Sequence, residues 1–492
     1  MRALISIGCS TLASIAVLCT VDARAADAHA DGGDVVSKVM ARAPQIESAA
    51  MRIWDLAEVG YQEVDSSRVL QEQLRAAGFR VETGIAGMPT AFLARYRRGA
   101  GPVIALLAEF DALPGLSQTA SASREPRPGH DAGHACGHNL FGAASVNAAV
   151  ALKQWLDARG TGGEVRVYGT PAEEGGSGKV YFVRSGAFDD VDVTLHWHPG
   201  DRNTAEQTRA LSNVSGKFRF HGRSAHAAQA PDQGRSALDG VEAMNFMVNA
   251  MREHVPQDAR IHYVITNGGA APNVVPDFAE AYYYVRHVDS KVVLEIMERV
   301  KKAAEGAALG TGTRVEFEQT GGTYSTLPND TLGRLMDASL RQIGPPHWDA
   351  ADIAAARALR ATLPRAGDRA ENAWREIETY GVDEVNYGST DVGDVSWVTP
   401  TVGLRTSTWP PGTPAHSWQA AAASGMAIGV KGAVTAAQVL ALTGRKLFED
   451  PDLVAQARAE FERRRGPQFE YSALVGERAP PLDYRGPQRK AR

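Results

Sequence analysis

The sequence predicts an α/β protein in which a larger domain with a mostly parallel central sheet carries a smaller, inserted ferredoxin-like domain. The chain has 492 residues, whereas a single hydrophobic core stops growing near ~250–300 residues. Residues 103–108, VIALLA, form a continuous apolar run that is typical of a strand buried on both faces. Between residues 211 and 320 the expected elements follow the order β-α-β-β-α-β, which is that of a ferredoxin-like unit.

The larger domain is expected to alternate helices with strands before and after the insertion. Apolar residues recur at helical spacing near the N-terminal end, and short apolar runs follow them. This alternation predicts a mostly parallel sheet covered by helices. The expected helices cover 34–57, 64–78, 142–158 and 419–443, and the expected strands cover 103–108, 164–169, 191–198 and 401–406.

The inserted domain is predicted from a change in pattern after Asp201. Its first helix, at 234–253, has apolar residues spaced alternately by 4 and 3, which places them on one face. These residues are Ala237, Val241, Met244, Val248 and Met251. Strands are expected at 211–220, 260–266, 278–287 and 312–320, with a second helix at 290–307.

The chain is therefore divided into five parts, in this order: a signal segment, the first part of the larger domain, the inserted domain, the second part of the larger domain, and a tail. Residues 345–385 form an irregular, charged and partly helical stretch whose role the sequence does not reveal. The tail is rich in Pro and Arg, and we expect it to be a surface extension or disordered. The expected ranges are 1–25, 34–207, 208–323, 324–447 and 466–492.

The N-terminus predicts export. Arg2 is followed by an apolar stretch from Ala3 to Val21 and by a small-x-small cleavage site at residues 23–25, as in a secretory signal. An uncleaved membrane anchor is the alternative, because a stretch of 19 mostly apolar residues nearly spans a bilayer. Cleavage after Ala25 removes two of the three cysteines, so the mature chain has only Cys136 and no internal disulfide.

Composition excludes several classes of protein. Hydrophobic residues make up 44% of the chain and charged residues 22%, which argues against a disordered chain and a multi-pass membrane protein. The formal net charge of −5 gives no basic excess, so nucleic acid is not an expected partner. We expect no membrane association after cleavage of the signal.

The densest polar cluster surrounds the remaining cysteine. His134, Cys136 and His138 lie within five residues just before a helix, and thiolate and imidazole are both good ligands for zinc-like metals. A Cys–His nucleophile dyad is the competing interpretation. A nucleophilic thiolate usually takes its base from elsewhere in the fold, so two groups on one loop favour a shared metal.

Further candidates follow other strands of the expected sheet, where open α/β sheets place their sites. The adjacent carboxylates Glu173 and Glu174 suit a metal ligand beside a proton acceptor, although an ordinary acidic turn is the alternative. His196 and His198 end one strand, and His416 precedes a later helix. Asp111, after another strand, suits a carboxylate that orients a metal-bound histidine, or a turn residue. The inserted domain adds donors suited to an oxyanion and a carboxylate: His226, Asn273 and Arg286.

Taken together, these motifs resemble the M20-type metallopeptidases and amidohydrolases over about residues 34–445. The resemblance implies a metal-binding catalytic domain, with the inserted domain acting as a lid and a dimerisation domain. The motifs that carry it are AEFDALPG (108–115), GHACGHNLFGA (133–143), GTPAEEGG (169–176), WHPGD (197–201), GRSAHAA (222–228), GRSALD (234–239), APNVVP (271–276), STDVGDVSW (389–397) and GTPAHSWQ (412–419).

The resemblance also implies roles for individual residues. Two divalent metal ions, with zinc or manganese expected, would be bound by Cys136, His138, Glu174, His198 and His416, with Cys136 as the bridge. Glu173 would be the general base, and Asp111 would support a ligand. His226 would polarise the scissile carbonyl, reaching across from the partner subunit in a dimer, and Asn273 and Arg286 would contact the substrate.

Two departures from the wider family are visible. Glu109 stands where that family usually has a histidine, and Cys136 takes the place of a bridging aspartate, as in the subgroup that splits acyl–amino acid amides. His134 and His196 receive no role.

The expected function is that of a metal-dependent amidohydrolase. It would cleave the amide bond of an N-acyl amino acid, such as a p-aminobenzoyl-glutamate-like compound, or of a small peptide through a metal-activated water. The alternatives are a dipeptidase or carboxypeptidase, a non-catalytic partner subunit of a hydrolase complex, and a cysteine-nucleophile hydrolase. A homodimer is expected, with a heterodimer with a related subunit as the alternative.

Overall fold

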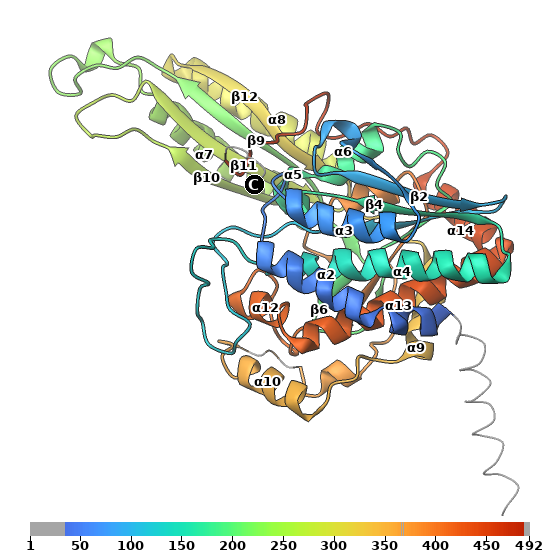
Figure 1. Cartoon of the computed structure of the whole chain (residues 1–492). Helices are drawn as coiled ribbons and strands as arrows, with labels where there is room; N and C mark the ends of the chain where they lie inside the picture. The colour runs from blue at the N-terminus through green and yellow to red at the C-terminus, as the bar shows by residue number, and fades with distance from the viewer. Residues whose placement is uncertain (1–34, 366, 368, 487–492) are drawn as a thin grey trace, which may run out of the picture.

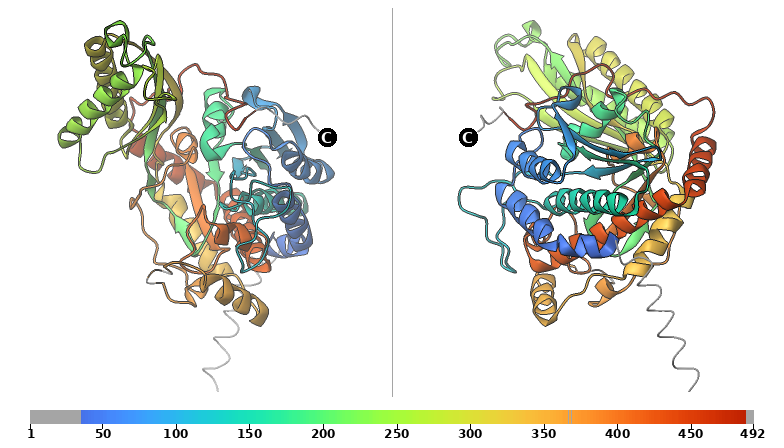
Figure 2. Two further views of the ribbon diagram at one scale, coloured as in Figure 1. Left: turned by 90° about the vertical axis from the view of Figure 1, so that its left-hand side faces the viewer. Right: turned by 45° about the vertical axis from the view of Figure 1, so that its right-hand side comes forward.

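A computed structural model describes residues 35–365, 367 and 369–486. The predicted signal segment, 1–25, lies outside the described residues. The structure has a larger α/β body and an inserted domain that projects from it, as Figures 1 and 2 show. Each part has its own apolar core: one cluster is built on the central sheet and its helices, and the other on the inserted sheet. Two separate cores support the proposed domain division.

The central sheet is mixed and parallel in its middle. Its strand order is β1-β2-β4-β3-β5-β14-β6, with β7 paired to β14. β3 pairs in parallel with β4 and β5, and β14 pairs in parallel with β5 and β6. The pairings of β1 with β2, β2 with β4 and β7 with β14 are antiparallel. The bounds are β1 Arg80–Thr83, β2 Phe92–Arg98, β3 Val103–Ala108, β4 Gly163–Gly169, β5 Val193–Leu195, β6 His198–Gly200, β7 Thr204–Glu206 and β14 Thr401–Ser407.

The predicted mostly parallel sheet is thus confirmed, but its antiparallel strands were not predicted. β2 has the sequence FLARYRR, whose charged second half hides the apolar signal of a strand. The strand expected at 191–198 is broken into β5 and β6 by residues 196–197. Both short strands still pair with β14, so the chain keeps its direction across the break.

Helices cover the sheet and form the remainder of the body. α4 packs against β3 and β4, and α13 packs against α4 and β14. The single helix expected at 419–443 is two helices, α12 and α13, and α9, α10 and α14 were not predicted individually. The bounds are α2 Ala43–Leu56, α3 Val64–Ala76, α4 His138–Arg159, α5 Glu173–Gly176, α6 Gly178–Arg184, α9 Asp330–Ile343, α10 Ala350–Arg360, α11 Val392–Ser396, α12 Trp418–Ala423, α13 Ala427–Glu449 and α14 Pro451–Arg465.

Among the described residues, α13 is the one helix that is long and apolar enough to cross a membrane. Its 18-residue apolar window is 72% buried inside the protein. Burial of that kind identifies a core helix, because its apolar side chains already have protein partners.

The inserted domain has the predicted ferredoxin-like topology. Its antiparallel sheet has the order β10-β11-β9-β12, and α7 and α8 pack on β9 and β11. Both helices begin at a side-chain cap, since Ser236 accepts from the Asp239 N–H and Asp289 accepts from the Lys291 N–H. The bounds are β9 Ser212–His221, α7 Ala237–Met251, β10 Arg260–Asn267, β11 Phe278–His287, α8 Ser290–Thr311 and β12 Arg314–Thr323.

The two segments whose sequence was least informative both pack on the body. Residues 345–385 contain α10, and Trp348 and Trp374 stack at 4.5 Å in a small third core. The tail is a surface extension as far as residue 486. It packs against the rest of the protein there, because Leu474 and Val475 are buried. The alternative expectation of disorder is therefore wrong for residues 466–486.

Candidate metal centre

The candidate residues of the body converge at one edge of the central sheet. Asp111 follows β3, the loop from residue 170 to α5 follows β4, and His198 follows β5, at the start of β6. Because the carboxyl ends of parallel strands meet at the same edge, side chains far apart in sequence lie together there. The loop before α4 brings Cys136 and His138 to this edge, and the loop after β14 brings His416.

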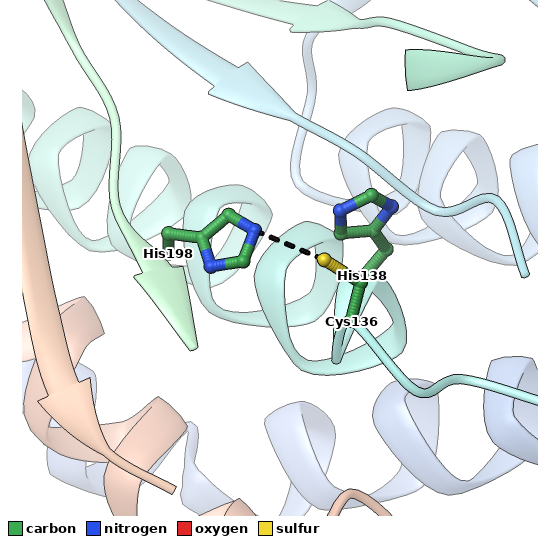
Figure 3. Close-up of side chains that lie close together, drawn as sticks. All are labelled: Cys136, His138 and His198. Atoms are coloured by element: carbon green, nitrogen blue, oxygen red, sulfur yellow. Dashed lines mark hydrogen bonds between the residues drawn. The ribbon is translucent and has the colours of Figure 1, made fainter. Parts of the chain in front are cut away.

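Two glycines shape the loop that presents Cys136. Gly137 has φ +76°, a conformation that L side chains rarely adopt, and a Cβ on it would lie 2.7 Å from the Pro199 ring. A Cβ on Gly133 would lie 2.1 Å from the carbonyl oxygen of Leu116. The close approach of Gly137 to Pro199 packs the loop against β6. The Cys136 Sγ then lies 3.4 Å from Nε2 of His198 (Figure 3).

In the part of the chain that the structure describes, three groups of side chains could hold a metal ion, and within each group the ligand atoms lie within 4.8 Å of one another. The groups are Cys136, His138 and His198; Cys136, Glu174 and His416; and His138, Glu173 and Glu174. Cys136 belongs to two of these groups. The structure therefore brings together all five residues proposed as ligands. The Cys136 thiol lies between the pair His138 and His198 and the pair Glu174 and His416.

His138 is held between two carboxylates. Its Nδ1 lies 2.8 Å from Oδ1 of Asp111, and its Nε2 lies 3.0 Å from Oε2 of Glu109. Burial disfavours its protonated form, but the interactions with Cys136, Glu109 and Asp111 outweigh burial and hold the pKa of His138 well above its ordinary value. Asp111 also accepts from the Glu174 N–H at 2.9 Å. It thus orients one proposed ligand and the backbone of another.

The surroundings of His198 favour the neutral form of its imidazole ring. Burial is the main cause that holds its pKa well below the ordinary value, with the nearby Arg405 charge second. Its Nδ1 lies 2.7 Å from the carbonyl oxygen of Pro199, so Nδ1 carries the proton and donates there. The lone pair of Nε2 is then directed toward Cys136, which is the state that a metal requires.

Three buried polar atoms in this cluster lack a hydrogen bond: Oε2 of Glu109, Nε2 of His138 and Oε1 of Glu174. Each has an ion-pair neighbour in the cluster: Oε2 of Glu109 and Nε2 of His138 lie 3.0 Å apart, and Oε1 of Glu174 lies 3.1 Å from Nε2 of His416. Buried polar atoms are normally satisfied, and those that are not call for an explanation. A thiolate, three imidazoles and a carboxylate form a donor set typical of zinc-like cations, so the residues present fit such ions.

Glu173 and Glu174 lie in a short, irregular helix, α5. Burial raises the pKa of Glu173 well above its ordinary value, with the charges of Glu109 and Glu174 adding to the shift. Such a carboxyl group attracts protons strongly, which suits a residue that accepts a proton and then returns it.

A buried ion network beside Glu173 was missed at the sequence level. Nζ of Lys179 lies 2.6 Å from Glu109 and 2.7 Å from Asp391, and all three side chains are buried. This cation balances the carboxylates around Glu173 and fixes Glu109 beside His138. Asp391 lies in the quoted STDVGDVSW motif, but Lys179 had no signal of its own, because one lysine on a short helix is ordinarily solvated.

A cavity of about 1040 Å³ opens on the cluster. The cluster residues that line it are Glu109, Cys136, Glu173, Glu174, His198 and His416, and His196 lines it as well. Other parts of the wall come from β6 and β7 and from residues 384–390. Its volume suits a small molecule of the size of an acyl amino acid.

The three candidates of the inserted domain lie elsewhere. His226 and Asn273 are exposed on neighbouring loops, where the Ala227 N–H donates to the Asn273 carbonyl at 3.0 Å. Neither lines the cavity of its own chain. Arg286 is half-buried, and its Nη1 lies 3.2 Å from Oγ of Ser389, a residue of the cavity wall.

His134 and His196 stand apart from the three ligand groups. Nε2 of His134 lies 3.0 Å from the Ile53 carbonyl oxygen, and burial lowers the pKa of this side chain to about 3. His196 is also buried, and its pKa is lowered to about 4 mainly by burial. His134 therefore acts as a structural link between the Cys136 loop and α2.

The comparisons with known proteins agree with this fold. Residues 211–311 match the family model of the peptidase dimerisation domain. The chain is 42% identical over 440 residues to one of the subunits of p-aminobenzoyl-glutamate hydrolase of Escherichia coli K12, covering 84% of this chain and 91% of that protein. It is 29% identical to the mouse Xaa-Arg dipeptidase, covering 85% of this chain and 91% of that protein.

A solved Bacillus subtilis structure, described as a dinuclear metal binding peptidase of the M20 family, superposes with a TM-score of 0.57. The match covers 83% of this chain and 99% of that chain at 19% identity. At that identity the superposition supports the fold alone: an α/β body with an inserted domain.

Proposed function

The chain belongs to the M20 family of metallopeptidases and amidohydrolases, and on that premise we propose that it hydrolyses the amide bond of an N-acyl amino acid with two divalent cations. The observation that carries the proposal is the position of Cys136, whose thiol is shared by two groups of ligand atoms. One group adds His138 and His198, and the other adds Glu174 and His416. This arrangement suits one bridging thiolate between two ions.

When bound, a pair of cations lowers the pKa of water toward ~7 and polarises the scissile carbonyl. Glu173, whose carboxylate lines the cavity, takes the proton of the attacking water and delivers it to the nitrogen of the leaving amine. Asp111 keeps His138 in one orientation, and Lys179 holds Glu109 in place beside it. Zinc and manganese are the ions that we propose.

The cysteine-nucleophile alternative is disfavoured by the charge around Cys136. Burial, followed by the charge of Glu174, raises the pKa of this thiol above its ordinary value. A nucleophilic cysteine requires a lowered pKa, because the thiolate is the reactive form. We therefore propose that Cys136 becomes a thiolate only on binding metal.

The proposed substrate is a p-aminobenzoyl-glutamate-like compound. Arg286 supports a free carboxylate on it, because the Arg286 Nε is buried without a hydrogen-bond partner and Nη1 reaches the cavity wall at Ser389. The test is hydrolysis of acyl-glutamates, acyl-aspartates and dipeptides by the purified mature protein. Cleavage of acyl-glutamates above the others is expected. Preference for dipeptides would favour a dipeptidase, and metal without any hydrolysis would favour a non-catalytic partner protein.

Because residues 1–25 have the pattern of a signal, we also propose that the enzyme is exported.

We propose that the enzyme is a homodimer formed through the inserted domain. β10 is an edge strand whose residues 262–267 are all exposed, and Tyr263, Val264 and Ile265 are among them. An exposed apolar edge strand is a template for pairing with a second copy. The matched family model is named for dimerisation. A dimer would let His226 and Asn273, which do not line their own cavity, serve the cavity of the partner.

Replacing His226 with alanine is expected to lower turnover by about 10²–10³-fold, the usual loss for one donor to a developing oxyanion. Metal content is expected to stay the same, because His226 lies outside the three ligand groups. Steady-state kinetics and elemental analysis check both points. Loss of metal in this variant would place His226 among the ligands.

Mixing two inactive variants tests where His226 acts. If it serves the partner's site, a mixed dimer of His226→Ala and Glu173→Ala contains one site with both residues intact. A 1:1 mixture is then expected to regain about a quarter of wild-type activity. Activity that stays at the level of the separate variants after verified subunit exchange would contradict action across the dimer.

Metal affinity is expected to rise with pH. Burial raises the pKa of Cys136, and hydrogen bonds to Cys136 and Glu174 raise the pKa of His416 to about 10. Both groups hold protons near neutral pH, and a metal must displace them, so affinity tightens about tenfold per pH unit for each proton released. Chelator competition between about pH 6 and pH 8 measures the slope. A flat profile would show that these groups do not bind the metal.

A further inference from the structure

We propose that Tyr484 and Arg485, near the C-terminus, are positioning residues that hold the backbone of the Glu173–Glu174 loop in place. Residues 466–486, which we call the strap, follow α14 and run past the inserted domain to α5. The Tyr484 hydroxyl donates to the carbonyl oxygen of Glu174 at 2.9 Å, and Nη2 of Arg485 donates to the same oxygen at 2.5 Å. Two donors of the strap thus converge on the peptide between the proposed ligand Glu174 and Gly175.

The loop needs external support because its backbone is irregular. Ala172 and Ser177 have φ values of +57° and +56°, in the left-handed region that is uncommon for residues other than glycine. Glu174 and Gly175 depart from helical angles inside α5. A segment of this kind keeps its conformation only when the surrounding structure specifies it.

The backbone of the loop is contacted by three separate parts of the protein: the segment between α2 and α3, Asp111 and the strap. The Ala172 N–H donates to Glu63 at 2.8 Å, and the Glu174 N–H donates to Asp111 at 2.9 Å. The carbonyl oxygen of Gly176 accepts from the Tyr61 hydroxyl at 2.8 Å. The strap adds the contact at the Glu174 carbonyl, on the peptide that directly follows the proposed ligand.

The Tyr484 ring lies in a slot that glycines keep open. A Cβ on Gly60 would lie 2.2 Å from the Tyr484 hydroxyl oxygen, and a Cβ on Gly176 would lie 3.3 Å from the ring. The Tyr61 ring meets the Tyr484 ring edge-on at 5.7 Å. Because a side chain at Gly60 would displace the ring, the body is shaped to receive this residue of the strap.

The strap is anchored upstream, so its end is held near the loop. Nη1 of Arg184, in α6, donates to the carbonyl oxygens of Gly476 and Arg478 at 2.6 and 2.8 Å. Arg478 in turn reaches β12, where Nη2 lies 3.1 Å from Oε1 of Glu318. The Tyr181 hydroxyl lies 3.4 Å from the Ala479 carbonyl oxygen. The strap therefore joins the inserted domain, α6 and the metal-binding loop.

The proposal rests on the proposed function, because it takes Glu173 as the base and Glu174 as a metal ligand. Neither Tyr484 nor Arg485 lines the cavity. Losing them is therefore expected to displace the two carboxylates without removing a substrate contact. A small displacement of catalytic groups can cost as much as ~10²-fold in rate. We expect kcat to fall about 10–100-fold while KM changes by less than about threefold.

The test compares Tyr484→Phe, Arg485→Lys and the double variant Tyr484→Phe/Arg485→Ala with the wild-type full-length chain. Tyr181→Phe is the matched control, because it removes a hydroxyl that contacts the strap away from the loop. The first readout is hydrogen exchange of the metal-free proteins at residues 172–177, and the second is kcat and KM of the metal-loaded proteins. The rate of zinc loss to a chelator is the third.

The double variant is expected to exchange the amides of residues 172–177 at least about tenfold faster, and to lose zinc faster, while Arg485→Lys and Tyr181→Phe stay near wild type. If the double variant fails to fold, Tyr484→Phe, which removes one hydroxyl, is expected to show a smaller rise of the same kind. Unchanged exchange in a folded double variant would overturn the proposal whatever the activity. A wild-type protein that binds no metal and hydrolyses nothing would instead overturn the proposed function.

Discussion

The substitution Glu173→Gln is expected to abolish almost all hydrolysis while leaving both metal ions in place. The substitution preserves the size of the side chain but removes its capacity to accept a proton. General acid–base catalysis contributes about 10²–10⁴-fold, so kcat is expected to fall by that factor. The metal is expected to stay because Glu173 is absent from both groups that contain Cys136, which are the groups proposed to hold the two ions. Glu173 belongs only to the group with His138 and Glu174. Turnover and elemental analysis of the same preparation provide the measurement.

The matched control is Glu384→Gln. Glu384 also lines the cavity but lies outside the three ligand groups, and it is exposed. The same chemical change there is expected to leave kcat within about twofold of wild type, as for most exposed sites. Near-normal turnover in Glu173→Gln would show that Glu173 is not the base, and lost metal would make it a ligand.

Replacing Cys136 with serine is expected to abolish binding of the ion pair. Cys136 is the one side chain shared by the group that contains His198 and the group that contains His416, so its loss affects both proposed ions. Changes to residues that only support metal ligands typically cost 10–100-fold in affinity, and we expect more than about 100-fold here. Hydrolysis is expected to disappear with the metal. Titration with zinc, followed by competition with a chelator, measures the affinity.

His134→Gln is the control for the Cys136 substitution. His134 lies two residues away in the same loop, but its side chain contacts the Ile53 carbonyl and not the ligand groups. Its loss is expected to lower stability while leaving two ions bound. If Cys136→Ser keeps two tightly bound ions and normal turnover, the bridging assignment is wrong.

Much of the fold could be predicted because it depends on local patterns. The continuous apolar run at 103–108 is β3, in the middle of the sheet, and the 4-3-4-3 spacing in 234–253 predicted α7. The β-α-β-β-α-β order is confirmed in full. Missed elements have weak local signals: β2 is half charged, β1 has four residues and β7 has three. Such strands are defined by their pairing partners, which a single sequence does not reveal.

The site could be predicted in part for a similar reason. Cys136, His138, Glu173, Glu174, His198 and His416 lie at element boundaries on one sheet edge, and motif resemblance selected them. Lys179 and Glu63 could not be found in this way. Neither residue has an unusual local sequence. The fold buries Lys179 against the carboxylate of Asp391, and it buries Glu63 against the N–H of Ala172 in the irregular loop. The strap escaped prediction because its composition indicates a solvated tail, whereas Tyr484 is held in a slot between glycines distant in sequence.

The most direct measurement is anomalous diffraction from crystals of the mature protein soaked with or grown in zinc. The account predicts two peaks about 3.5–4 Å apart, on either side of the Cys136 Sγ. One ion is expected near His138 and His198, and the other near Glu174 and His416. A protein that is active but has a single peak, or peaks away from Cys136, would contradict the central claim that this thiol joins two cations.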